Sequence, residues 1–239
     1  MRAAEHTPID VLAFGAHPDD VEMGMGGTLV RLVDAGYSVL SVALTKSQMS
    51  TFGSVESRQR EFEEASRIMG CECLMLDFED QNVCNDFESR QAIARIIRQR
   101  TPKLVFAPYH TNPLGEPGGL NNVDHYTTGQ LVRDAIKLAR LDKAVAHVQK
   151  HTVQKLYFYM VPRTVWANLV VDVSDVLDRT LAAIHAYQSQ MKISVRGNSI
   201  DKYLITRRAA VGLEIGVEYA EAFVTDLPLR IEPGMFFEL

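Results

Sequence analysis

Short apolar runs alternate with amphipathic stretches along the first 107 residues, and this alternation limits the possible folds more than any other feature. Apolar runs of strand length cover residues 9–16, 38–45, 71–76 and 103–107. The stretches between them space their apolar residues as a helix does, and a glycine or proline follows each one; they cover residues 26–35, 55–69 and 86–101. A repeated strand–helix order predicts an α/β fold, with a mostly parallel sheet and helices on both faces.

The regular alternation stops after residue 107. Residues 108–123 contain three prolines and three glycines without apolar periodicity, which is typical of a long functional loop. Beyond it we expect a helix and two strands, then a helix that begins at Ser174 and ends near Met191; the first three cover residues 124–140, 156–160 and 169–173. We expect one domain over residues 1–239, with an irregular C-terminal part from about residue 192.

Composition excludes several classes of protein. The chain has 239 residues and a net charge of −5, which disfavours nucleic-acid binding by bulk electrostatics. Three cysteines cannot form a complete disulfide framework, and no apolar run approaches the length of a membrane span. Residues 1–10 lack the apolar core of a signal peptide. We therefore expect a soluble cytoplasmic protein that binds neither nucleic acid nor membrane.

The first polar motif, His17-Pro18-Asp19-Asp20, follows directly after the first predicted strand. Ligands of open α/β sheets bind beyond the carboxyl ends of the strands, and imidazole and carboxylate groups are good zinc ligands. The motif therefore predicts a metal site there. The alternative is a capped turn, in which Asp20 accepts hydrogen bonds from the first N–H groups of the next helix.

A second motif, Asn121-Asn122-Val123-Asp124-His125, follows the fourth strand and its long loop. It therefore reaches the same edge of the sheet. His125 would complete three protein ligands and leave a fourth position for water, which is the pattern of catalytic zinc sites. Asp124 as a simple helix cap is the alternative.

Arg58 lies early in the second helix, again at the carboxyl edge. Its guanidinium could bind a substrate oxygen, although a solvated helix arginine is the more common arrangement. Gly24-Met25-Gly26-Gly27 is a weak match to a dinucleotide-binding loop, because the first turn holds His-Pro-Asp-Asp instead of glycines. A nucleotide-binding oxidoreductase is therefore disfavoured.

The two polar motifs together resemble those of the PIG-L/LmbE-like zinc-dependent N-deacetylases, which remove acetyl groups from N-acetylglucosamine derivatives. The resemblance extends through residues 45–54, 58, 107–108, 171–173, 188–190 and 216–223. The last two of these stretches are most similar to the bacterial branch that deacetylates N-acetylglucosaminyl-malate in bacillithiol biosynthesis. The resemblance implies a Rossmann-like fold with the metal site at the carboxyl ends of the strands.

The resemblance also implies a role for each matched residue. His17, Asp20 and His125 match the ligands of Zn²⁺, for which Fe²⁺ is an alternative in the cell. Asp19 matches the general base, and Arg58 matches an arginine that contacts the substrate.

The chain departs from the family pattern at Asn122, where relatives carry the histidine that pairs with the aspartate corresponding to Asp124 and stabilises the oxyanion. Asn122 can donate an N–H but carries no charge. The alternative to an active enzyme is therefore a weakly active or non-catalytic relative that binds zinc or sugar, and His110 is a candidate replacement for the missing histidine.

The expected partner is a small N-acetyl sugar substrate. The resemblance and the apolar residues of 233–237 also lead us to expect a homo-oligomer, a trimer or a hexamer.

Overall fold

The computed structural model describes residues 7–113 and 122–228. The centre of the fold is a parallel β-sheet. The sheet has five strands in the order β3-β2-β1-β4-β5, and every neighbouring pair is parallel. The strands are β1 (Val11–Gly15), β2 (Val39–Thr45), β3 (Glu72–Phe78), β4 (Leu104–Pro108) and β5 (Lys155–Tyr159). The α/β fold with a mostly parallel sheet is therefore confirmed.

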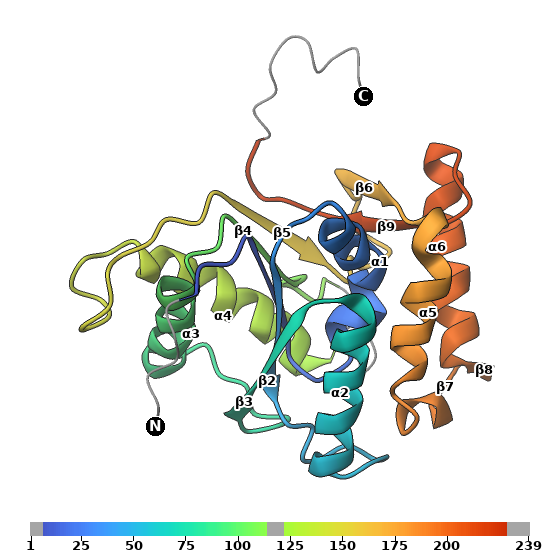
Figure 1. The fold of residues 1–239 in the computed structure, drawn as a ribbon, viewed down its shortest axis with the longest axis horizontal. Coiled ribbons are helices and arrows are strands. Elements are labelled where there is room, and N and C mark those ends of the chain that lie inside the picture. Colours follow the sequence, from blue (N-terminus) through green and yellow to red (C-terminus); the bar gives the residue numbers. More distant parts are fainter. Residues whose placement is uncertain (1–6, 114–121, 229–239) are drawn as a thin grey trace.

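Helices cover both faces of this sheet, as Figure 1 shows. The covering helices are α1 (Asp20–Asp34), α2 (Val55–Met69), α3 (Phe87–Arg100) and α4 (Val123–Ala139), with α5 (Leu177–His185) packed against α1 and α2. Successive residues of β1 point to opposite faces: Leu12 and Phe14 pack with α3 and α4, whereas Val11 and Ala13 pack with α1 and α2. Burial on both faces explains why the strands are continuous apolar runs.

The order of the strands creates a crevice beside β1. This strand lies between β2 and β4, and the helices that follow β1 and β4 lie on opposite faces of the sheet. Such a switch point is where open α/β sheets bind ligands. The chain leaving β1 and the start of α4 both reach it.

Helix α1 begins six residues earlier than the sequence predicts. It starts at Asp20, is interrupted by non-helical backbone at Met25, and only its second part matches the predicted helix over 26–35. Gly24 and Gly27 lower the helix propensity of this segment, which is why the sequence does not predict its first turns, but close packing requires both glycines. A Cβ atom at Gly24 would lie 2.4 Å from the Tyr159 ring, and one at Gly27 would lie 2.7 Å from Val173.

The C-terminal part is more regular than the sequence predicts. Instead of irregular structure after residue 192, the chain forms a short hairpin, the 16-residue helix α6 (Ile200–Ile215) and strand β9 (Ala220–Phe223). The hairpin strands are β7 (Ser194–Val195) and β8 (Asn198–Ser199), and β9 pairs antiparallel with β6 (Leu169–Asp172). The apolar residues of α6 are spread around the helix without a stripe, so periodicity does not reveal it.

The helix predicted from Ser174 to Met191 is also shorter. Residues 174–176 form a 3₁₀ turn, α5 ends at His185, and a second 3₁₀ turn covers 190–192. In the part of the chain that the structure describes, no helix is long and apolar enough to cross a membrane.

Candidate metal centre

The turn between β1 and α1 holds its polar side chains over the carboxyl edge of the sheet. Gly15 gives the turn room, because a Cβ atom there would lie 2.9 Å from Cβ of Asp20. Asp19 has a φ of 124°, a backbone conformation that costs a non-glycine residue on the order of 1–3 kcal/mol. Strain of this kind persists only where the surrounding structure enforces it. Here it occurs in the turn that carries the candidate metal ligands His17 and Asp20.

Three potential metal ligands converge at this edge: His17 from the turn, Asp20 at the start of α1, and His125 in the first turn of α4. Nε2 of His125 lies 3.1 Å from Oδ1 of Asp20 and 3.3 Å from Nδ1 of His17. Nδ1 of His17 lies 3.5 Å from Oδ2 of Asp20. Ligand atoms of a tetrahedral zinc ion are about 3.3 Å apart, which follows from bond lengths near 2.0–2.1 Å. The donor set and its spacing therefore fit a zinc-like ion.

Behind this triad, two more carboxylates face the other nitrogen of His17. Nε2 lies 3.1 Å from Oδ1 of Asp80 and 3.5 Å from Oδ2 of Asp124. A carboxylate that accepts the second N–H of a metal-bound histidine fixes its tautomer and orientation. The arrangement therefore presents Nδ1 of His17 to the metal position.

The surrounding groups also determine the protonation of His17 and Asp20 when no metal ion is bound. Burial alone would lower the pKa of His17, but the hydrogen bonds to Asp124, Asp20 and Asp80 outweigh it and raise that pKa well above its usual value. Burial would raise the pKa of Asp20, yet the imidazoles of His125 and His17 hold it far below the ordinary range. The centre thus favours positive charge, as a cation site must.

Hydrogen bonds of Asp124 and Asn122 fix the start of α4. The carboxylate of Asp124 is fully buried and accepts hydrogen bonds from the backbone N–H groups of Gln81 (2.7 Å) and Val83 (3.3 Å). Oδ1 of Asn122 accepts the N–H of Asp124 at 3.0 Å and so caps the helix. The amide nitrogen of Asn122 is left as the donor of that side chain, which lines the pocket described below.

Asp19 pairs with a buried arginine. Its Oδ2 lies 2.9 Å from Nη2 of Arg58, which also donates to the carbonyl oxygen of Pro18. Arg58 is 1% exposed, and its guanidinium stacks 5.2 Å from the centre of the Tyr187 ring. Burial raises the pKa of Asp19 above its ordinary value, although the charge of Arg58 opposes the shift. The solvated arrangement considered for Arg58 is therefore wrong.

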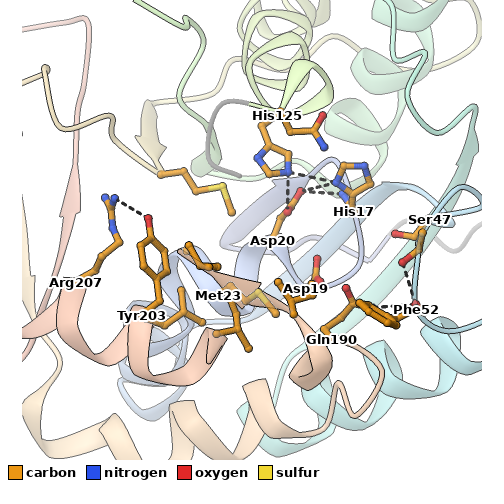
Figure 2. Close-up of a pocket in the computed structure, with 18 of the residues that line it drawn as sticks. His17, Asp19, Asp20, Met23, Ser47, Phe52, His125, Gln190, Tyr203 and Arg207 are labelled. Atoms are coloured by element: carbon orange, nitrogen blue, oxygen red, sulfur yellow. Dashed lines mark hydrogen bonds and ion pairs between the residues drawn. The ribbon is translucent and has the colours of Figure 1, made fainter. Parts of the chain in front are cut away.

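A cavity of about 760 Å³ opens beside the triad. Figure 2 shows His17, Asp20 and His125 on one side of it and Tyr203 and Arg207 of α6 on the other, with Gln190 and Phe52 at the lower right of the view. Its size is that of a small-molecule binding site. A metal position at the rim of such a cavity has access to a substrate.

Comparisons with known proteins show the family of this chain. The family model "PIG-L: GlcNAc-PI de-N-acetylase" matches residues 12–136, which include both motifs. The chain belongs to the PIG-L family. Among relatives of this PIG-L protein, the diacetylchitobiose deacetylase of Thermococcus kodakarensis is 31% identical, over 96% of this chain and 85% of that protein. The resemblance to N-deacetylases is thus confirmed.

Two further relatives extend the comparison. The probable N-acetyl-α-D-glucosaminyl L-malate deacetylase 2 of Bacillus cereus is 27% identical, over 75% of the PIG-L chain and 83% of its own length. The crystal structure of the conserved protein TT1542 from Thermus thermophilus superimposes with a TM-score of 0.84 at 33% identity, covering 94% of this chain and 98% of that one.

Of the residues considered from sequence, the site of this PIG-L member brings together His17, Asp19, Asp20, Arg58, Asn122, Asp124 and His125, with one exception, and Asn121 lies outside the described residues. The exception is His110, which does not line the cavity in the described residues. Its Nε2 lies 3.2 Å from Asp226, and its ring packs on Phe158. The sequence analysis missed two features of the site. Asp80 follows β3, and the buried ion pair of Arg208 with Glu221 (2.7 Å) forms part of the cavity wall. The position of Asp80 just beyond a strand was the available signal for it.

Proposed function

We propose that this PIG-L protein is a zinc-dependent N-deacetylase that hydrolyses the acetamide of an N-acetylglucosamine conjugate. The observation that carries the proposal is the triangle of donor atoms from His17, Asp20 and His125 beside a cavity that Asp19 also lines. Zinc bound there would polarise the acetamide carbonyl and activate water. The same nitrogen and oxygen donors also accept Fe²⁺, the alternative ion in the cell.

Each side chain has a part in the proposed reaction. Asp19 takes a proton from the attacking water and delivers it to the departing amine, and its raised pKa suits that exchange. Arg58 holds the Asp19 carboxylate. Its Nη1 lies 3.7 Å from Oε2 of Glu61, and its Nε has no hydrogen-bond partner among the described residues; since Arg58 also lines the cavity, we assign it the contact with a substrate oxygen. Asp124 acts through His17 as a positioning residue, and the Asn122 amide is a neutral donor for the developing oxyanion.

The specific conjugate belongs to the proposal as well. Relatives act on two kinds of N-acetylglucosamine compound, diacetylchitobiose and, by its name, a malate conjugate. We favour the malate conjugate of bacillithiol biosynthesis, since stretches near residues 188–190 and 216–223 resemble that branch. Cytoplasmic location, a single domain and a trimeric or hexameric assembly stay predictions; the apolar residues 233–237 that motivated the assembly lie outside the described residues.

Two variants test the division of roles. His17→Ala should lose stoichiometric zinc, because one of three ligands is gone. Asp19→Asn should keep the zinc but lose on the order of 10²-fold or more in the rate of acetate release, the usual scale for a lost general base. Metal analysis and an acetate assay on both proteins check this.

Two results would contradict these roles. Full zinc content in His17→Ala removes the ligand assignment, and a near wild-type rate in Asp19→Asn removes the base. A zinc-loaded wild type that releases no acetate from any N-acetylglucosamine conjugate would favour the zinc- or sugar-binding alternative that Asn122 suggests.

A further inference from the structure

The cavity has opposite charge at its two ends. Four cationic side chains line it, and two of them are neutralised by carboxylates: Arg58 by Asp19 and Arg208 by Glu221. The other two, Lys192 and Arg207, have no ion-pair partner within 4.0 Å among residues 7–113 and 122–228. Of these two, Lys192 is exposed, and Figure 2 shows Arg207 across the cavity from Asp19 and Asp20.

Arg207 is held in place without being neutralised. Its Nη2 donates to the carbonyl oxygen of Val161 at 3.2 Å, and its Nη1 donates to the Tyr203 hydroxyl at 3.4 Å. Both partners are neutral oxygens of residues that themselves line the cavity wall. A guanidinium has five N–H donors, so these two bonds orient the group and leave donors free for a ligand.

The composition of the wall around Arg207 matters equally. The cavity wall that α6 and Val161 provide includes the apolar residues Val161, Ile200 and Leu204 beside the ion pair of Arg208 and Glu221. An unpaired cation half-buried beside apolar side chains is costly unless an anion meets it in use. The guanidinium fork matches a carboxylate or a phosphate, and both can be bound through two parallel hydrogen bonds.

We propose that Arg207, together with Tyr203, binds an anionic group of the substrate, a carboxylate or a phosphate, on the part remote from the acetamide. This inference rests on the proposed function, because the acetamide must lie at the metal end. It makes α6 the element that selects the substrate by charge. Neutral conjugates of the same shape would be deacetylated less efficiently.

The test compares substrates that differ in charge. The carboxylate arm is N-acetylglucosaminyl-L-malate, its neutral counterpart is the dimethyl ester, and the phosphate arm is the methyl phosphodiester of N-acetylglucosamine 1-phosphate. Arg207→Gln should lower kcat/KM about tenfold for the better charged substrate, mainly through KM, and no more than about twofold for the ester. Arg207→Lys should recover part of the loss. The charged substrate with the higher kcat/KM in the wild type identifies the anion as a carboxylate or a phosphate.

Lys202→Gln is the matched control, because it removes one positive charge from the same helix at an exposed position outside the cavity. Lys202→Gln should leave kcat/KM unchanged for the charged substrates and for the neutral ester. Equal losses for charged and neutral substrates in Arg207→Gln, or no loss at all, would overturn the inference.

A binding measurement separates this inference from the proposed function. Calorimetry on the zinc-loaded protein with the amine product, glucosaminyl-L-malate, and with its dimethyl ester needs no turnover. The charged amine should bind about tenfold more tightly to wild type and lose that advantage in Arg207→Gln. If no conjugate is deacetylated but this difference appears, the anion site stands and the deacetylase proposal falls. If the difference is absent and Arg207→Gln also spares the phosphodiester in the rate comparison, the anion site falls.

Discussion

Asp80 contacts the nitrogen of His17 that is not among the three converging donor atoms of His17, Asp20 and His125. Its side chain is 3% exposed and accepts three hydrogen bonds, from Nε2 of His17 at 3.1 Å, from the backbone N–H of Met49 at 2.8 Å and from the side-chain amide of Gln81 at 3.3 Å. Although burial alone would raise the pKa of Asp80, these hydrogen bonds lower it, so the carboxylate is ionised at neutral pH. It therefore fixes both the tautomer and the direction of His17.

Asp80→Asn should weaken zinc binding on the order of 10–100-fold, because an amide cannot orient the imidazole as a carboxylate does. Asp77→Asn is the control: Asp77 lies three residues earlier, is 80% exposed, and pairs only with Lys46 at 2.7 Å among the described residues. Competition with a coloured chelator measures both affinities. Equal affinities of Asp80→Asn and wild type would show that Asp80 has no part in the centre.

The position of His125 depends on how closely helix α4 approaches strand β4. Gly129, one turn after His125, is buried against the end of β4. A Cβ atom there would lie 2.2 Å from the carbonyl oxygen of Pro108 and 2.9 Å from Cα of His110. Both neighbours are backbone atoms, so a side chain would have to push the helix away from the sheet.

Gly129→Ala should therefore destabilise the protein by about 1–3 kcal/mol and weaken zinc binding, although alanine ordinarily favours a helix. Gly26→Ala in α1 is the comparison, since the nearest atom to its Cβ would be a Thr180 methyl at 3.3 Å. Its free energy of unfolding should change by less than about 1 kcal/mol. Urea unfolding of both variants checks the difference, and a neutral or stabilising Gly129→Ala would contradict the close approach.

At the scale of the whole molecule, sequence reasoning succeeded where burial is regular. The parallel strands are buried on both faces, so they are apolar runs, and strand ends in such a sheet predict which motifs meet. That is why the strand pattern alone could place residues 17–20 and 122–125 at one edge of the sheet.

The secondary structure of the C-terminal part could not be predicted from local patterns, because contacts between distant segments hold it in place. Its place is set by Arg208 of α6, whose guanidinium bonds Glu221 of β9 while that carboxylate accepts the N–H groups of Gly27 (3.1 Å) and Thr28 (2.8 Å) in α1. Contacts between segments 194 residues apart leave no local periodicity in the sequence. The cavity wall, and the anion site proposed on it, depend on these contacts.

The central claim is that a metal held by His17, Asp20 and His125 makes this PIG-L protein an N-deacetylase. Acetate release from N-acetylglucosaminyl-L-malate and from diacetylchitobiose, measured on chelator-stripped protein before and after one equivalent of zinc, tests it most directly. We predict no release from the stripped protein and sustained release, with the free amine formed in equal amount, once zinc is restored. Equal release with and without zinc, or none from either compound in the zinc-loaded protein, would contradict it.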